Sequence, residues 1–449
     1  TTPISTRGSL FQLDWPALPT FPQAECPDSW ALVGDYKHLP DGLHHLPTYP
    51  DLTHPDLADT DLVLWALPTN VTGDPLHQLH ALTQHTLTQL QHWLARPDTL
   101  NTQLAVLTRQ AVATGADDRA PDLAHAATWA LLHTTQNEHP NRITLIDTTH
   151  DTNGLINILA TLNRTLTEPQ LALRHGSAHT PRLSPTTGTP QRSPADWDRR
   201  GTVLITGGTG ILGGLFAEHL ITRYGMEHLL LISRRGLDAP GAAELRQRLP
   251  QLGAEVTITA CDTSNRIELA TVLDAIPDQH RLTAVIHAAG VLADTVVTEL
   301  TDSQLHTVLA AKADAAWHLH QLTADRDLAA FVLFSSAAGT LGNPGQANYA
   351  AANAFLDALA HHRPGATSLA WGYWQNPSGM TAQLGAVDRA RVTRSSLTPI
   401  SNDHGLALFD TAITHHQPNL VPASINTAAL SRLARANTLP PILDALTTT

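Results

Sequence analysis

The sequence predicts an α/β fold built from two halves, each organised around a mostly parallel sheet. Short apolar runs of strand length alternate with stretches of helical periodicity along most of the chain. One stretch, residues 176–197, is rich in Pro, Ser, Thr and Gly and has almost nothing apolar to bury, so we expect it to connect the two halves. Strand–helix alternation implies a sheet that helices cover on both faces.

The first half, residues 1–196, is expected to be a structural subdomain. Leucines recur at mostly helical spacing over residues 76–94, and two further helix-like stretches are 123–133 and 153–162. The predicted strands are 61–67, 102–108, 142–147 and 170–175. No Gly-rich turn follows the early strands, so this half has nothing with which to hold a pyrophosphate.

The second half, residues 197–449, repeats the alternation and adds residues that can do chemistry. We expect its apolar runs to form a seven-stranded parallel sheet. The predicted strands are 202–206, 229–233, 255–260, 284–288, 331–335, 367–371 and 419–423.

Length and composition exclude several classes of protein. The chain has 449 residues, too many for one ordinary core. Its formal net charge of -13 argues against a nucleic-acid partner. No apolar run approaches the ~20 residues that a membrane span needs, and the N-terminal residues lack a signal-peptide pattern. The chain opens on Thr1 rather than on a methionine, so we expect it to be a segment of a longer polypeptide.

Cysteine and histidine offer no metal site by their spacing. The two cysteines, Cys26 and Cys261, cannot form a disulfide framework, and we interpret them as inert thiols of a protein from the reducing cytoplasm. The 26 histidines are scattered, and no Cys/His cluster has zinc spacing. Those along the Leu-rich helix are interpreted as solvated polar positions: His77, His80, His85 and His92.

A glycine-rich turn after the first strand of the second half predicts a dinucleotide site. Gly208, Gly210 and Gly213 have the GxGxxG spacing, and they lie directly between an apolar strand and an amphipathic helix. Glycines let the backbone approach a pyrophosphate, which then lies on the free N–H groups of the helix N-terminus. The predicted cofactor-binding residues of this turn are Gly207, Gly208, Thr209, Gly210, Ile211, Leu212 and Gly213.

The end of the second strand indicates which dinucleotide is bound. An NAD enzyme usually has Asp or Glu here, whereas this chain has Ser233, Arg234 and Arg235. Because Arg pairs with a 2′-phosphate, we expect NADPH, with one of the two arginines a solvated loop charge. Asp262 is expected to contact the adenine. The run expected to approach the ribose is Ala288, Ala289 and Gly290.

A serine and a tyrosine have the spacing of a known catalytic pair. Ser336 ends a strand, and Tyr349 follows thirteen residues later at the start of a helix. This pattern resembles the short-chain dehydrogenase/reductase family, which adds a Rossmann-like fold to the expectation. The resemblance implies that both hydroxyls bind a substrate carbonyl and that Tyr349 delivers the proton. Free tyrosine has a pKa of ~10, so a nearby ammonium is needed to lower it.

The lysine that would supply this ammonium does not occupy its usual position in the sequence. Ordinary members have Lys four residues after the Tyr, and this chain has Asn353 there. Lys312, one of only two lysines with Lys37, instead occupies the preceding helix, where those members have Asn. The exchange resembles the ketoreductase domains of modular type I polyketide synthases. That resemblance implies that Lys312 tunes Tyr349 and that Asn353 holds the Lys312 network.

The resemblance covers nearly the whole chain and implies the reaction. A degenerate Rossmann-like half before a complete one is the architecture of that family. Its members reduce a β-ketoacyl thioester that phosphopantetheine links to an acyl carrier protein, and they act beside other domains of the same synthase. The run WGYW, residues 371–374, followed by Gly379 and Met380, resembles the entry to a substrate lid near 374–400.

The family contains types that reduce opposite faces of the ketone. No Trp lies between Ser336 and Tyr349, which is unlike the A type. The B type has Leu-Asp-Asp after the fourth strand, and this chain has Leu292-Ala293-Asp294, with the middle Asp lost. Residue 351 is Ala rather than Pro, unlike the epimerising B subtype. We expect a B-type enzyme that forms the D-hydroxyl, with these substrate-orienting residues: Leu292, Asp294, Pro344, Gln346, Asn348, Trp371 and Met380.

Two alternatives from other classes stay open at this point. A catalytically silent scaffold domain of a synthase would have lost Tyr349, Ser336 or Lys312, and all three are present. A free-standing reductase of small ketones or sugar nucleotides would not need the degenerate first half. Incubation with NADPH and a β-ketoacyl thioester separates the three possibilities.

Overall fold

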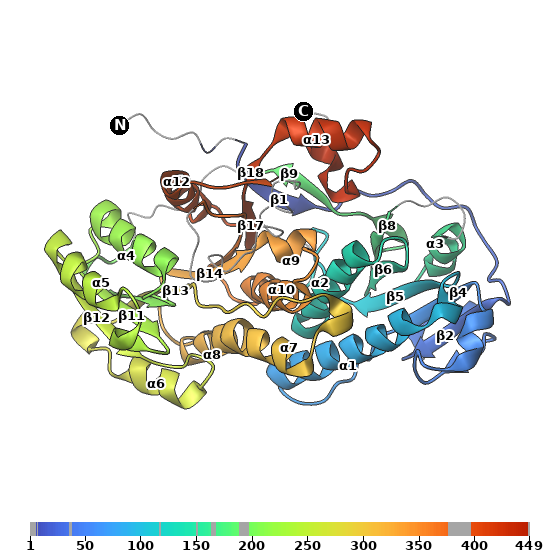
Figure 1. Ribbon diagram of the computed structural model, residues 1–449, viewed down its shortest axis with the longest axis horizontal. Helices are drawn as coiled ribbons and strands as arrows, with labels where there is room; N and C mark the ends of the chain where they lie inside the picture. Colours follow the sequence, from blue (N-terminus) through green and yellow to red (C-terminus); the bar gives the residue numbers. More distant parts are fainter. Residues whose placement is uncertain are drawn as a thin grey trace.

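The computed structural model describes residues 6, 8–35, 38–115, 118–149, 151–162, 168–187, 197–375 and 397–447. Within these ranges the strands form two large sheets, one of nine strands and one of seven. Figure 1 shows the sheet of the second half on the left with its helices and the sheet of the first half on the right. No described helix is both long enough and apolar enough to cross a bilayer.

The larger sheet contains the seven predicted strands of the second half, all parallel to one another. From one edge they are β12 (Glu255–Ala260), β11 (His228–Ser233), β10 (Thr202–Thr206), β13 (Leu282–His287), β14 (Ala330–Ser336), β15 (Ala366–Trp371) and β17 (Asn419–Pro422). The chain order reverses between β10 and β13. Ligands of such sheets bind beyond the carboxyl ends of the strands at this switch point.

Two antiparallel strands extend this sheet beyond the seven that we expected. β1 (Leu10–Asp14) pairs with β17, and β9 (Arg182–Pro185) pairs with β1. The expectation that 176–197 only connects the halves is therefore wrong for its first part, because β8 (Ser177–His179) and β9 are both strands. Leu183 explains β9, because it is fully buried in an apolar cluster with Phe11 and Val421.

The helices around the larger sheet position the candidate site. They include α4 (Ile211–Tyr224), α7 (Asp302–Leu309), a π-helical turn (Ala310–Asp314), α8 (Ala315–Leu322), α9 (Ala337–Leu341) and α10 (Ala347–His362). The remaining helices of this half are α5 (Ala242–Arg248), α6 (Arg266–Asp274), α12 (Asn402–Ala412) and α13 (Thr427–Arg435). β16 (Leu397–Thr398) and β18 (Ser424–Ile425) form a separate two-stranded ribbon.

The sheet of the first half is parallel except for its last strand. Its order is β3 (Thr48–Tyr49), β2 (Trp30–Gly34), β4 (Leu62–Ala66), β5 (Gln103–Arg109), β6 (Ile143–Thr148), β7 (Gln170–Arg174) and β8. Its helices are α1 (Pro75–Ala95), α2 (Leu123–Glu138) and α3 (Leu155–Leu162). The sequence prediction missed β2, whose buried run WALVG ends in Gly34 at φ 85 without a further glycine to cradle a phosphate.

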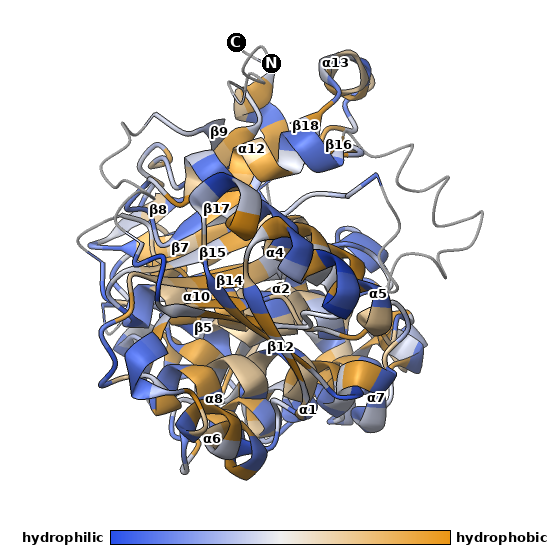
Figure 2. Cartoon of the chain, turned by 90° about the vertical axis from the view of Figure 1, so that its left-hand side faces the viewer, coloured by the Kyte–Doolittle hydropathy of each residue, from blue (hydrophilic) through white to orange (hydrophobic). Residues whose placement is uncertain are grey.

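The two halves share one apolar core. Buried residues of α1 and α2 belong to the same cluster as residues of α7, α8 and α10, and α2 packs along α10 while α1 lies beside α7 (Figure 1). Figure 2 shows the apolar strands and helices inside and hydrophilic residues outside. The interpretation of His80 as a solvated position is wrong, because its Nε2 lies 2.9 Å from the Asp314 carboxylate across this interface.

Candidate active site

The glycine-rich turn after β10 leaves no room for side chains. Gly207 has φ 65, and a Cβ there would lie 2.9 Å from the Cα of Ala289. A Cβ on Gly208 would lie 2.7 Å from Leu231, and one on Gly213 would lie 2.4 Å from the carbonyl oxygen of Gly207. Glycine at these positions therefore lets the turn, β11 and the first turn of α4 approach one another closely.

The N-terminus of α4 fits a pyrophosphate. Gly210 is its N-cap residue and offers no side chain to the first N–H groups of the helix, which remain available to an anion. Ile211, the first helical residue, is 49% exposed although it is apolar, and Leu212 is half-buried. These features fit a nicotinamide dinucleotide lying across the turn.

The loop after β11 places two arginines beside this turn. Thr209 Oγ1 donates to Ser233 Oγ at 2.8 Å, and Ser233 Oγ accepts from the Gly236 N–H at 3.1 Å. Arg234 and Arg235 follow directly and are both exposed. Among the described residues neither guanidinium forms an ion pair, so both can meet an anionic ligand.

The residues that directly follow β13 and β12 also lie at this end of the sheet. Ala288 and Ala289 donate their N–H groups to the carbonyl oxygen and the hydroxyl of Thr206 at 3.3 and 3.2 Å. A Cβ on Gly290 would lie 2.9 Å from Lys312 Cε, so glycine here lets the lysine pass. Asp262, just after β12, binds the Ser264 N–H and hydroxyl with its Oδ1.

Ser336 and Tyr349 come together at the carboxyl end of the sheet, as predicted. Ser336 ends β14 and is the N-cap residue of α9, where its Oγ accepts from the Ala338 N–H at 3.2 Å. Tyr349 lies in the first turn of α10 and is half-buried. Burial raises the pKa of Tyr349, whereas hydrogen bonds from Asn353 and Ser336 lower it. The two hydroxyls are thus within reach of one substrate atom.

Lys312 and Asn353 form a buried pair behind Tyr349. Lys312 is 3% exposed, and its Nζ donates to the carbonyl oxygen of Phe334 at 2.8 Å and to Asn353 Oδ1 at 2.9 Å. Asn353 Nδ2 in turn donates to the Tyr349 carbonyl oxygen at 2.7 Å. The ammonium lies 5.3 Å from the centroid of the Tyr349 ring. The four residues that the sequence singled out therefore form one cluster.

A buried hydrogen-bond chain that we did not predict supports Lys312. His287, at the end of β13, lies 3.0 Å from the Lys312 carbonyl oxygen through Nε2 and 2.7 Å from Thr206 Oγ1 through Nδ1. Burial lowers the pKa of His287 to about 3, with a further decrease from Lys312. A neutral ring with its proton on Nε2 satisfies both contacts. The Lys312 carbonyl belongs to the π-helical turn, a feature that often occurs at functional sites.

The electrostatics of the cluster make Lys312 a weaker base than a free lysine and leave it partly protonated near neutral pH. Burial lowers the pKa of Lys312 to about 7, while Asp357 raises it. Burial raises the pKa of Asp357 to about 6, although a hydrogen bond from Ser368 lowers it. Lys312 and Asp357 are both buried, at 3% and 9% exposed.

Two loops that flank Tyr349 contain most of the predicted substrate-orienting residues. Gln346 Nε2 donates to Asp294 Oδ2 at 2.6 Å, and Asn348 Nδ2 donates to the Ala293 carbonyl oxygen at 2.9 Å. Residues 291–296 and 341–346 thus bind each other beside the tyrosine. Among the predicted residues of these loops, Leu292, Pro344 and Gln346 are half-buried and Asp294 is exposed.

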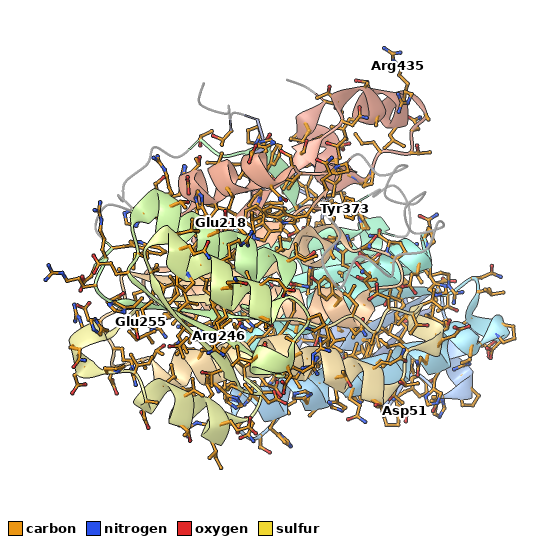
Figure 3. The ribbon with its side chains drawn as sticks, turned by 60° about the vertical axis from the view of Figure 1, so that its left-hand side comes forward. Asp51, Glu218, Arg246, Glu255, Tyr373 and Arg435 are labelled. Carbon is orange, nitrogen blue, oxygen red and sulfur yellow. The ribbon has the colours of Figure 1, made fainter. Side chains whose placement is uncertain are left out.

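Two of the predicted substrate-orienting residues do not join this group. Trp371 is 5% exposed and packs in the core against Phe334 and Trp374, with ring centroids 5.6 and 4.9 Å apart. The prediction for Trp371 is wrong, because its side chain points to the face of the sheet that α4 covers. Met380 and residues 376–396 of the predicted lid lie outside the described residues. Tyr373, labelled in Figure 3, is half-buried just before them.

The described residues include no group of three or more His, Cys, Asp or Glu side chains that could hold a metal ion. The cysteines are free thiols, and burial raises the pKa of both Cys26 and Cys261 to about 11. Both thiols are therefore protonated near neutral pH, as expected for inert cysteines.

Family models match both halves of the chain. A model described as "KR domain" matches residues 201–376. A second, described as "Polyketide synthase extender module SpnB, Rossmann fold domain", matches residues 13–183. The first match contains the Gly-rich turn and the cluster around Tyr349, and the second contains the sheet without a phosphate turn.

Individual proteins give the same assignment. The polyketide synthase GfsA of Streptomyces halstedii is 47% identical over 365 residues, 80% of this chain but 5% of that protein. A solved structure titled "Structure of A-type Ketoreductases from Modular Polyketide Synthase" is 32% identical, with a TM-score of 0.83 and 98% of each chain covered. A C2-type ketoreductase from a modular polyketide synthase is 27% identical, with a TM-score of 0.80, 98% of this chain and 100% of that chain covered.

The fold, the dinucleotide turn and the cluster at the carboxyl end of the sheet agree with these matches. The degenerate first half and the complete second half are each recognised separately. The chain belongs to the ketoreductase domains of modular polyketide synthases, which are nicotinamide-dependent oxidoreductases of the short-chain dehydrogenase/reductase superfamily.

Proposed function

We propose that this domain, with residues 1–196 as its structural and 197–449 as its catalytic subdomain, uses NADPH to reduce the β-keto group of a polyketide thioester to a D-β-hydroxyl. The acyl chain would be attached by phosphopantetheine to an acyl carrier protein of the same synthase. The observation that supports this most is the convergence of Ser336, Tyr349, Lys312 and Asn353 at the carboxyl end of the sheet.

The residues divide the chemistry between them. Bound NADPH would supply the hydride that adds to the ketone carbon. Ser336 donates a hydrogen bond to the ketone oxygen and orients it, and the Tyr349 hydroxyl transfers its proton to that oxygen. The carbonyl π bond breaks as one C–H and one O–H bond form, and the proton on Tyr349 is later replaced from solvent. Lys312 stabilises the transient tyrosinate, and Asn353 holds Lys312 against the tyrosine.

The arginines beside the turn support NADPH over NADH. Arg234 and Arg235 are exposed at the end of β11, where the 2′-position of the adenosine ribose would lie. No carboxylate occupies this position to favour a free 2′-hydroxyl. One guanidinium would form charge-assisted hydrogen bonds with the 2′-phosphate. Asp262 and the run 288–290 would contact the adenosine.

The two loops beside Tyr349 support the B type. Overall similarity does not distinguish the types, because A-type and C2-type ketoreductases match with nearly equal TM-scores. The distinction therefore depends on individual residues. Asp294 is held by Gln346, and Asn348 holds the backbone of Ala293. These contacts hold in place the loop 291–296, beside which the acyl chain would enter the site.

The partners follow from the relatives that the chain resembles. The chain spans about 5% of the length of the synthase GfsA. We propose that it acts as one domain of such an assembly, receives its substrate from the carrier protein and works in the cytoplasm.

Incubation of the purified domain with NADPH and a β-ketoacyl carrier protein tests the proposal. Loss of NADPH absorbance together with a β-hydroxyacyl product supports it. Tight NADPH binding without reduction would indicate a silent scaffold instead. Reduction of small ketones without reduction of the thioester would indicate a free-standing reductase.

A further inference from the structure

One carboxylate of the structural half reaches both loops that flank Tyr349. Glu138 is the last residue of α2. Its Oε2 accepts from the Val297 N–H at 2.7 Å, and its Oε1 accepts from the Gly345 N–H at 2.7 Å. Val297 lies just after the loop 291–296, and Gly345 lies in the loop 341–346. The two oxygens of one side chain therefore bridge the two loops.

The neighbouring residue of α2, Asn137, also binds the second loop, but as a hydrogen-bond donor. Asn137 Nδ2 donates to the carbonyl oxygens of Leu341 and Gly342, at 2.9 and 2.5 Å. Gly342 has φ 67, and a Cβ on it would lie 2.7 Å from Asn137 Nδ2 and 2.9 Å from the His133 ring. The backbone of the second loop thus packs directly on α2, at both of its ends.

The loops that Glu138 bridges are those that bear the substrate-orienting residues. Asp294 lies on the first loop, and Pro344 and Gln346 lie on the second. The loops also contact each other directly, through Gln346 and Asp294 and through a β-bridge between Thr295 and Gln346. Both contacts of Glu138 are to backbone N–H groups, so its carboxylate can fix the distance between the loops without engaging their substrate-orienting side chains.

We propose that Glu138, assisted by Asn137, is a positioning residue through which the structural half sets substrate orientation in the catalytic half. It fixes the loop pair 291–296 and 341–346, and the loop pair fixes the direction from which the acyl chain meets Tyr349. This inference rests on the proposed ketoreductase function. It gives the degenerate first half a role in stereocontrol in addition to packing.

Glu138→Gln tests the proposal with little change in volume. The amide keeps one acceptor oxygen, but its NH2 group faces an N–H donor, so one of the two bridges is lost. Glu138→Ala removes both bridges. We expect kcat/KM for a β-ketoacyl thioester to fall about threefold to tenfold in the Gln variant and further in the Ala variant. The change should appear mainly in KM and in the ratio of D to L product, while the Kd for NADPH stays unchanged.

Gln84→Ala provides a matched control. Gln84 crosses the same interface, donating from Nε2 to Asp302 Oδ2 at 2.8 Å, but it contacts α7 rather than either loop. We expect it to leave the D to L ratio and KM unchanged. Thermal unfolding of all variants shows whether the domain remains folded at the assay temperature.

The wild-type domain separates failure of this inference from failure of the proposed function. If the wild type does not reduce the thioester, the proposed function is wrong. If the wild type reduces it and folded Glu138→Gln and Glu138→Ala give the wild-type KM and product ratio, the positioning role is wrong. A fall in kcat with equal loss of NADPH affinity would also contradict it, because that pattern indicates general destabilisation.

Discussion

Replacing Lys312 by Met should change both the pH dependence of folding stability and the turnover, and the two effects can be measured separately. The lysine is almost fully buried, and burial lowers its pKa from 10.5 to about 7. In the unfolded chain the same amine stays protonated up to its ordinary pKa. Between the two values the unfolded state binds more protons, so raising the pH stabilises the folded state. Below pH 7 both states are protonated, and the cost of burying the charge is constant.

The size of this effect follows from the two pKa values. Between pH 7 and pH 9 the wild type should gain about 2 kcal/mol in free energy of unfolding relative to Lys312→Met, at about 1.4 kcal/mol per pKa unit. At pH 7 the variant avoids the cost of a buried ammonium. It also leaves the acceptors Phe334 O and Asn353 Oδ1 without their donor, at about 1–3 kcal/mol each. We therefore expect the two proteins to have similar stability at pH 7.

Denaturant unfolding at several pH values measures this difference. Arg435→Met is the matched control, because Arg435 is exposed at the end of α13 (Figure 3). The curve of this control should run parallel to that of the wild type. Turnover of Lys312→Met should fall by about 10²-fold or more, since the tyrosinate loses its cation. Parallel pH–stability curves for wild type and Lys312→Met would refute the buried, depressed lysine.

Three further substitutions test the roles of individual residues. Tyr349→Phe keeps the ring and removes the proton donor, so turnover should fall by ~10²–10⁴-fold. Fluorescence titration should show unchanged NADPH binding, and near wild-type turnover would exclude Tyr349 as the donor. Arg234→Ala should weaken NADPH about tenfold and leave NADH nearly unchanged, and equal weakening of both would move the role to Arg235. Gly213→Ala places a Cβ 2.4 Å from the Gly207 carbonyl oxygen. We therefore expect thermal unfolding to show a loss of about 1–3 kcal/mol in stability, together with weaker NADPH binding. An unchanged Kd for NADPH would contradict the close-approach argument.

Local patterns predicted most of the catalytic half. The strands of its sheet were located to within about two residues, because fully buried parallel strands are continuous apolar runs, such as Thr202–Thr206. Ser336, Tyr349 and Asn353 were found by their spacing and Lys312 by a family resemblance, and the structure brings the four together. These features depend on residues close in sequence or on a motif with fixed intervals.

What the sequence did not predict depends on contacts between distant residues. β9 was interpreted as a connector from its Pro, Ser, Thr and Gly content. Composition could not show its pairing with β1, which joins residues far apart in the chain, such as Leu13 and Leu183. Trp371 was assigned to the substrate from the resemblance of WGYW to a lid entry. Its position at the end of a strand does not reveal which face of the sheet the side chain covers. His287 could have been suspected, since a histidine ending a buried strand needs polar partners. Glu138 gave no signal, because its partners are backbone N–H groups.

The most direct measurement is the identity of the product formed on a loaded carrier protein. The domain is incubated with NADPH and a β-ketoacyl thioester on its acyl carrier protein, and the released acyl group is examined by mass spectrometry and chiral chromatography. We predict a gain of one hydride and one proton, mostly the D-hydroxyl, and no inversion at the α carbon. A predominantly L-hydroxyl would contradict the B-type assignment, and an unreduced thioester with bound NADPH would contradict the ketoreductase activity itself.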